Sequence, residues 1–263
     1  MSAVVFLGGG RITSAMLAGL RLGKTRHRLI VHDHNPGKLR DLKRRFAVAV
    51  EPDLTSAVRQ ADVLIVAVRP NSVRELLQRI KKEDGRLLAV SLAAGVPLRV
   101  LNKVSGAHLQ WARAMPSPVC RSGHGLTALT FSRNLSQSER KRVRDLFTGF
   151  GRVVEIPESK FDAFTVTYSC SHGFHALATL ADVAQQAGLD RNTALMASAH
   201  ALADGIIAWR QGRHSIKALL DEAVTPGGIA EATVNAMDAA GFRRAVRQAV
   251  AAGLRRTRAN ASK

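Results

Sequence analysis

The chain opens on an apolar run that passes directly into glycines. Residues 4–7 form a short, uninterrupted apolar segment, as expected of a strand buried on both faces. Glycines occupy positions 8–10, and apolar and small residues then recur at helical spacing over residues 12–20. Strand, glycine turn and helix are the opening of a dinucleotide-binding βαβ unit, whose helix N-terminus faces a pyrophosphate. Thr13 stands where the fingerprint usually has a third small residue, so the motif is imperfect.

Apolar runs and helical patterns continue to alternate as far as about residue 115. We expect strands at residues 29–33, 47–50, 62–68, 87–92 and 110–116, with helices at 35–45, 53–59 and 73–80. Asn35 before Pro36, and Asp53, are residue types that cap helix N-termini. The alternation predicts an α/β fold with a doubly wound sheet, which binds ligands at the carboxyl ends of its strands.

The pattern changes in the second half of the chain. We expect strands at 127–131 and 153–156 around a helix at 136–147, and only helices from residue 160 onward, including 172–187, 191–210 and 241–257. The apolar stripes of these helices are rich in small residues, which favours close packing against other helices. The sequence therefore predicts a Rossmann-like dinucleotide-binding domain at 1–155 and an all-α dimerisation and substrate domain at 156–263.

Composition narrows the class of protein. No run of 18 apolar residues is present and the chain starts on a strand, so we expect neither a membrane span nor a signal peptide. Cys120 and Cys170 fit no metal or redox spacing, which favours the reducing cytoplasm. The net charge of +19 suits an anionic ligand and raises nucleic acid as a rival partner. Because basic and aromatic residues do not interleave, we expect a solvated basic surface and no nucleic-acid partner.

The candidate cofactor residues fall at the predicted carboxyl ends of strands. They are Gly8, Gly9, Gly10, Asp33, Val68, Arg69, Pro70, Ala93, Ala94, Met115, Pro116 and Ser117. Asp33 lies 23 residues beyond Gly10, where an acidic residue can accept hydrogen bonds from an adenosine ribose. His34, Asn35 and Lys38 could instead hold a 2′-phosphate, so the sequence leaves NAD(H) and NADP(H) both open.

Blocks of residues across nearly the whole chain resemble pyrroline-5-carboxylate reductases. These blocks include Phe6-Leu7-Gly8-Gly9-Gly10, Ala67-Val68-Arg69-Pro70, Ser91-Leu92-Ala93-Ala94-Gly95, Arg113-Ala114-Met115-Pro116 and Thr225-Pro226-Gly227-Gly228. That family reduces a cyclic imine, 1-pyrroline-5-carboxylate, to L-proline with a hydride from NAD(P)H. The resemblance implies a proline-biosynthetic oxidoreductase that uses NADP(H), with NAD(H) as the alternative. It also implies a homodimer, or an assembly of dimers, built from the C-terminal helices.

The resemblance further assigns roles to individual positions. It implies that Gly8, Gly9, Gly10, Arg11 and Ile12 line the pyrophosphate, that residues 68–70 flank the adenosine, and that Ala93, Ala94 and residues 115–117 approach the nicotinamide. The implied substrate residues are Ser171, Thr225, Pro226, Gly227, Gly228, Ile229 and Ala230.

Three departures from the family pattern concern the substrate. Ser117 replaces an asparagine, residues 167–172 replace the family's entry to its long helix, and Ile229 and Ala230 stand where the family has a threonine. A hydroxyl that could donate or relay a proton is therefore lost. Two hypotheses follow: a reductase of this or another imine, and a non-catalytic dinucleotide-binding protein that has lost its substrate site.

His172 and His175 are the titratable residues nearest the predicted entrance of the long helix. A histidine suits a general acid near neutral pH, so both are candidate catalytic residues. The alternative is that they pack or form hydrogen bonds locally. As a zinc pair they lack other ligands at a recognisable spacing, so we expect no metal.

Overall fold

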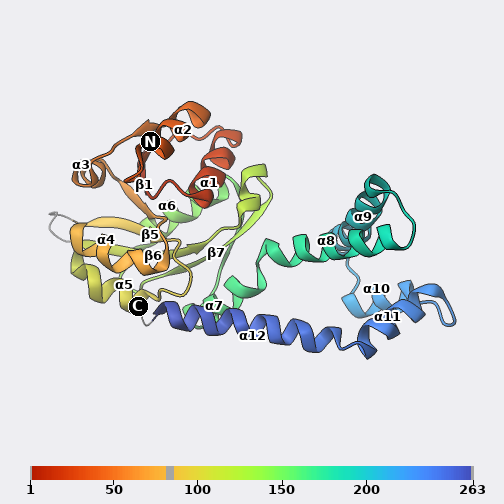
Figure 1. Ribbon diagram of the computed structural model, residues 1–263. Helices are drawn as coiled ribbons and strands as arrows, with labels where there is room; N and C mark the ends of the chain where they lie inside the picture. Colours follow the sequence, from red (N-terminus) through yellow and green to blue (C-terminus); the bar gives the residue numbers. More distant parts are fainter. Residues whose placement is uncertain (1, 81–85, 262–263) are drawn as a thin grey trace. The chain divides into compact units, whose positions relative to one another are not determined.

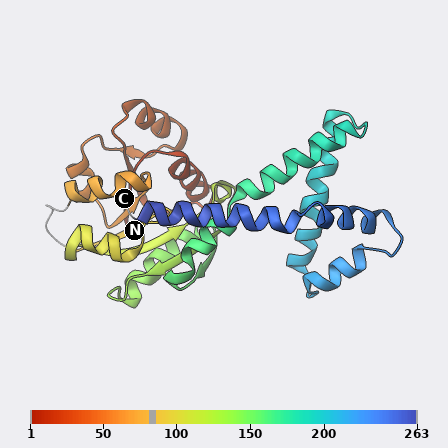
Figure 2. The same ribbon diagram turned by 60° about the horizontal axis from the view of Figure 1, so that its bottom comes forward.

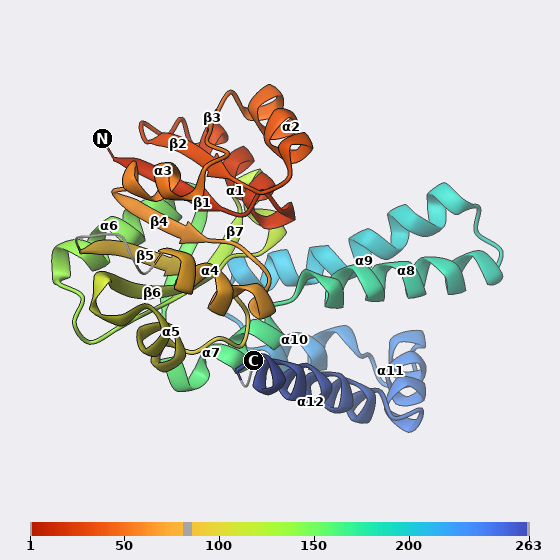
Figure 3. The ribbon, with the colours of Figure 1, turned by 60° about the vertical axis from the view of Figure 1, so that its left-hand side comes forward.

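A mostly parallel sheet is built from the first 155 residues of the chain. In the computed structural model, which describes residues 2–80 and 86–261, one sheet has eight strands in the order β3-β2-β1-β4-β5-β6-β7-β8 (Figures 1 and 3). The strands are β1 (Ala3–Leu7), β2 (Arg28–His32), β3 (Ala49–Val50), β4 (Val63–Val66), β5 (Leu87–Ser91), β6 (Leu109–Met115), β7 (Gly125–Phe131) and β8 (Gly151–Glu155). The doubly wound α/β sheet is thereby confirmed.

The pair β6–β7 is antiparallel, which the sequence pattern did not predict. Only residues 116–124 separate these two strands, and they hold the short helix η3 (Pro118–Ser122). A parallel crossover needs a dozen or more residues, so this connection is too short to carry the chain back across the sheet. β8 pairs parallel to β7, because α6 (Gln137–Thr148) provides a full crossover between them.

Helices cover both faces of the sheet and bury its apolar strands. α1 (Arg11–Leu22), α2 (Pro36–Phe46) and α6 pack on one face; α3 (Leu54–Arg59), α4 (Val73–Ile80) and α5 (Leu98–Ser105) pack on the other. In β1, Val4 and Phe6 point into the first layer, whereas Val5 and Leu7 point into the second. Alternate side chains are thus buried on opposite faces, which explains why this strand is apolar at every inner position.

Most helix boundaries agree with the sequence pattern. Asn35 accepts the N–H groups of Gly37 and Lys38, and Asp53 accepts that of Ser56, so both predicted N-caps are confirmed. α4 occupies the predicted residues, whereas α5 was not predicted. The remaining elements of this part are α7 (Glu158–Thr167), η1 (Pro70–Ser72) and η2 (Gly106–His108).

Contacts divide the chain into two compact units. The sheet unit comprises Met1–Tyr168 with Gly253–Lys263, and the helical unit comprises Ser169–Ala252. The predicted division at residues 155 and 156 falls at the end of the sheet, whereas the contacts keep α7 and the end of α12 with the sheet. The assignment of these parts to a dinucleotide domain and a dimerisation domain stays a prediction.

The helical unit exposes much apolar surface. It contains α8 (Cys170–Gln186), α9 (Arg191–Gln211), α10 (Ile216–Ala223), α11 (Ile229–Ala239) and the start of α12 (Phe242–Ala261). Of its residues, Ala181, Ala194 and Ser198 alone are buried. Large side chains such as Phe174, Met196, Ile206 and Ile229 are between 58% and 89% exposed. An exposed apolar surface of this extent is typical of an interface with another chain. Within the described part of the chain, no helix has both the length and the apolar character of a membrane span.

A buried arginine fastens α7 to the sheet. The guanidinium of Arg113, on β6, lies 3.2 Å from Glu158 Oε1, 3.4 Å from Asp162 Oδ1 and 4.3 Å from the ring centroid of Phe161. These three partners share one face of α7, at helical spacing. Glu158 Oε1 also accepts the N–H of Leu98, the first residue of α5, at 2.6 Å. One carboxylate therefore joins α5, β6 and α7.

We predict that Arg113→Ala lowers the free energy of unfolding by about 3 kcal/mol, because it removes a buried guanidinium that donates to both carboxylates and packs on the ring of Phe161. The measurement is urea unfolding followed by the fluorescence of buried Trp111. The matched control is Lys160→Ala, an exposed position on α7 that should change stability by less than about 0.5 kcal/mol. Equal stability of the two variants would contradict the structural role of Arg113.

Candidate functional site

The carboxyl ends of five adjacent strands bring the cofactor candidates to one edge. Strands β2, β1, β4, β5 and β6 are neighbours and parallel. Asp33 follows β2, Gly8 follows β1, Val68 lies just beyond β4, Ala93 lies just beyond β5, and Pro116 follows β6. The chain reverses its direction of progress across the sheet between β1 and β4, and ligands of open α/β sheets bind at such a point.

The three glycines differ in what they allow. Gly8 has a φ of +109°, and a Cβ there would lie 2.8 Å from the carbonyl oxygen of Ala67. A Cβ on Gly9 would lie 3.0 Å from Leu42 Cδ1. A Cβ on Gly10 would meet nothing within 4 Å. Packing of the protein itself therefore requires Gly8 and disfavours a side chain at Gly9, whereas Gly10 leaves open space in front of α1.

Thr13 explains the imperfect fingerprint. It is fully buried, and its hydroxyl donates to the carbonyl oxygen of Gly8 at 2.5 Å. The side chain thus braces the turn from within the first turn of α1. No side chain caps the N-terminus of α1 at Gly10, so the N–H groups of its first turn, at Arg11 and Ile12, are oriented to receive an anion.

The carboxylate of Asp33 accepts hydrogen bonds from backbone N–H groups. Oδ2 accepts the N–H of Gly9 at 2.7 Å and Oδ1 accepts that of Asn35 at 2.9 Å, and the side chain is 5% exposed. Burial alone would raise the pKa of Asp33, but these two N–H groups and the nearby Lys38 and His34 hold it below its ordinary value of 3.8. The carboxylate is therefore ionised at neutral pH and ties the glycine turn to the end of β2.

His34 and Lys38 present positive or protonatable groups at the same place. The side chain of His34 is 92% exposed, and that of Lys38 is 47% exposed, with Nζ 3.5 Å from Asp33 Oδ2. Asn35 uses its side-chain oxygen to cap α2. An incoming anion would thus meet Lys38 and His34 before it met the enclosed carboxylate.

The other end of this edge is more enclosed. Met115 is half-buried, while Pro116 and Ser117 are buried. The hydroxyl of Ser117 accepts the N–H of Val119 at 3.4 Å and so begins η3. Arg69 is exposed at the start of η1, beside half-buried Val68 and Pro70. The residue that departs from the family pattern at position 117 therefore has a local structural partner.

The substrate candidates lie in the helical unit. The turn before α11 is closed by the Gly228 N–H on the carbonyl oxygen of Thr225, at 2.9 Å, and Gly227 has a φ of +73°. The sequence pattern missed Glu231, whose Oε2 accepts the Gly227 N–H at 2.7 Å. An N–H group of this turn is therefore already hydrogen-bonded to a carboxylate of α11. Ile229 is 89% exposed at the helix start, next to exposed Ala230.

The catalytic candidates share that unit. Ser171, His172 and His175 lie exposed in the first two turns of α8, and Ser171 Oγ is 2.7 Å from Ser169 Oγ. The structure therefore groups the cofactor candidates in one unit and the catalytic and substrate candidates in the other. Over the described ranges, no group of three His, Cys, Asp or Glu residues could hold a metal ion.

Comparisons with known proteins find two family models that match different parts of the chain. Residues 158–260 match the family model of the pyrroline-5-carboxylate reductase dimerisation domain, and residues 3–95 match that of the coenzyme F420-dependent NADP oxidoreductases. The pyrroline-5-carboxylate reductase of Synechocystis sp. is 29% identical over 95% of both chains, and that of Methanosarcina acetivorans is 28% identical over 93% of both.

A solved structure shares the fold over the same extent. The pyrroline carboxylate reductase of Plasmodium falciparum, determined with NADP bound, aligns over 99% of this chain and 98% of its own, with a TM-score of 0.90 and 21% identity. Both ends of the chain thus match known domains, and curated relatives align along more than nine tenths of its length. Along nearly its whole length the chain is similar to pyrroline-5-carboxylate reductases.

Proposed function

We propose that the protein is an NADP(H)-dependent reductase that converts the cyclic imine 1-pyrroline-5-carboxylate to L-proline. The observation that carries the proposal is the open space at Gly10, in front of an uncapped α1, at an edge where four further strand ends meet. The relatives named pyrroline-5-carboxylate reductase support the reaction. An imine of this kind carries a carboxylate, so both partners of the reaction are anions.

The residues present fit a dinucleotide. The N–H groups of Arg11 and Ile12 would receive the pyrophosphate, and Lys38 and His34 would receive a 2′-phosphate. Ala93, Ala94 and residues 115–117 would hold the nicotinamide end. When bound, NADPH supplies the hydride. The enclosed position of Pro116 and Ser117 would keep water from that end.

The helical unit would supply the imine's partners. The turn over residues 225–228 would orient the substrate carboxylate, provided that Glu231 gives up the Gly227 N–H to it. His172 or His175, as an imidazolium, would donate the proton that the imine nitrogen requires before hydride arrives. An imine needs little else from a protein, since most of the chemistry belongs to the cofactor.

The C-terminal helices form a homodimer, as the matched dimerisation domain indicates. Their exposed apolar side chains supply the surface. We propose that the oligomer is this homodimer or an assembly of such dimers, that the small-molecule substrate is an imine, and that there is no nucleic-acid partner. The cytoplasmic location stays a prediction from cysteine usage.

Charge is divided unequally between the two units. Ser169–Ala252 contains seven Lys and Arg against seven Asp and Glu, so the formal charge of +19 belongs entirely to the rest of the chain. That remainder includes the edge proposed to bind the dinucleotide. The alternative hypothesis, a non-catalytic binding protein, rests on Ile229 and Ala230 and is not favoured over reduction.

Gly10→Val is expected to fold normally and to lose NADPH binding, because its side chain would fill the space proposed for the pyrophosphate. The measurements are thermal unfolding and titration of nicotinamide fluorescence. Gly8→Val is the matched contrast: the positive φ and the contact with Ala67 should make that variant unstable. Tight NADPH binding by Gly10→Val would sink the assignment of this turn.

Lys38→Gln is expected to weaken NADPH binding about five- to tenfold and to leave NADH binding unchanged, since it removes a cation proposed to face the 2′-phosphate. Lys43→Gln, an exposed lysine in the last turn of the same helix, is the control. Equal losses for NADPH and NADH in Lys38→Gln would show that the lysine does not read the 2′-phosphate.

Ala230→Thr should raise turnover of pyrroline-5-carboxylate, because it returns a hydroxyl near the proposed carboxylate site. His172→Ala should lower turnover severalfold if this histidine donates the proton. Steady-state kinetics on both variants, with cofactor affinity measured in parallel, provide the test. No gain from the first and no loss from the second, at unchanged cofactor affinity, would exclude these substrate and catalytic roles.

A further inference from the structure

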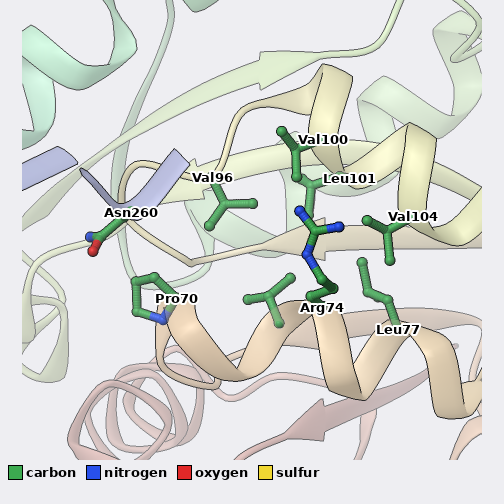
Figure 4. A pocket seen from close by; sticks show the side chains of 9 residues that line it. Pro70, Arg74, Leu77, Val96, Val100, Leu101, Val104 and Asn260 are labelled. Atoms are coloured by element: carbon green, nitrogen blue, oxygen red, sulfur yellow. The ribbon is translucent and has the colours of Figure 1, made fainter. Parts of the chain in front are cut away.

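The last turn of α12 contacts the loop between β5 and α5. Asn260 Nδ2 donates to the carbonyl oxygen of Ala94 at 3.1 Å, and both residues belong to the sheet unit. Figure 4 shows Asn260 beside Val96 and Pro70, at one end of an apolar pocket between α4 and α5. A residue almost at the end of the chain thus touches the loop that follows Ala93.

The contacted loop has the form of a type II β-turn. The N–H of Val96 donates to the carbonyl oxygen of Ala93 at 3.4 Å, and Gly95, the third residue, has a φ of +77°. In a type II turn the plane of the central peptide is roughly perpendicular to the plane of the turn. The carbonyl of Ala94 therefore points to one side and the N–H of Gly95 to the other. Asn260 binds the carbonyl side.

The residues of the turn do not by themselves determine the orientation of the Ala94–Gly95 peptide. Glycine adopts positive and negative φ about equally readily, so Gly95 also permits a type I turn. In that form the central peptide is turned over by roughly 180°, and the carbonyl of Ala94 faces the side now taken by the Gly95 N–H. Packing explains why the residue is glycine: a Cβ there would clash with the carbonyl oxygen of buried Thr257 on α12.

We propose that Asn260 is a positioning residue for the reaction, which fixes the Ala94–Gly95 peptide with its N–H directed away from α12 and toward the nicotinamide end of the site. This inference rests on the proposed function, because Ala93 and Ala94 are proposed neighbours of the nicotinamide. The hydrogen bond from Asn260 is absent from the turned-over form, so it shifts the equilibrium toward the type II turn. The site would then present a fixed peptide dipole at its nicotinamide end.

The helix that carries Asn260 also belongs in part to the helical unit. α12 is a single helix from Phe242 to Ala261, drawn in blue in Figure 2, and its first residues belong to the helical unit. The match to the dimerisation domain ends at residue 260. The residue that sets the turn therefore lies at the end of a helix that begins in the part of the chain responsible for dimerisation.

The test compares full-length Asn260→Asp and Asn260→Ala with the wild type. Aspartate keeps the shape of the side chain but has no N–H to donate, and it repels the carbonyl of Ala94. We expect faster amide hydrogen exchange over residues 92–98 in the cofactor-free protein. We also expect kcat to fall about five- to tenfold, with a smaller change in the KM for the imine. Asn260→Gln, which retains the donor, should recover part of the loss, and Arg255→Gln, at an exposed position on the same helix, should behave as wild type.

The outcomes distinguish a failure of the proposed function from a failure of the positioning role of Asn260. A wild type that neither binds NADPH nor reduces the imine would overturn the proposed function, while exchange at residues 92–98 would still report on the turn. An active wild type whose kcat is unchanged in Asn260→Asp and Asn260→Ala would overturn the positioning role. So would a loss of activity that Asn260→Gln does not lessen, or one that accompanies a loss of the dimer in light scattering. If Asn260→Asp fails to fold, Asn260→Ala decides by the same measures.

Discussion

The arrangement of the candidate cofactor edge depends on one buried carboxylate. Asp33 receives backbone N–H groups from Gly9, in the turn after β1, and from Asn35, at the start of α2. It thereby fixes two adjacent strand ends relative to each other, and Thr13 braces the same turn from the helix side. An ionised group with 5% exposure is tolerated there because N–H donors and Lys38 surround it. The place of the glycine turn, and so of Gly10 and the first turn of α1, therefore depends on this carboxylate together with the hydroxyl of Thr13.

The fold could be predicted from the sequence because strand burial and helix periodicity are local signals. The run at residues 4–7 and the caps at Asn35 and Asp53 indicate their elements directly. The antiparallel direction of β7 was not predicted, because the pattern of apolar residues gives no direction; it follows from the short connection over residues 116–124. α5 was also missed, because it is short and has no side-chain cap.

The site was predictable as a set of strand ends, but its interactions were not. Spacing suggested that Asp33 meets a ribose, which stays a prediction, but it did not indicate that the two oxygens also accept the N–H groups of Gly9 and Asn35. Thr13 counted as a flaw in the motif and proved to be part of the turn. Glu231 and Asn260 each contact a backbone group, one four residues away and the other 166 residues away. Contacts of this kind have no sequence signature, because any polar side chain of suitable reach can make them.

The unequal division of charge has a kinetic consequence. A charge of +19 confined to the sheet unit sets up a field that extends beyond the residues touching a ligand, over a distance of about 8 Å at physiological ionic strength. An anionic dinucleotide approaching that unit would be drawn in before it met Lys38 or α1, which raises its rate of capture. The neutral helical unit contributes nothing to this attraction and so can bring its apolar surfaces together without mutual repulsion. Rapid encounter with an anion favours a high positive charge, whereas close association with a second copy favours a net charge near zero. The chain meets these two requirements in different stretches of its sequence.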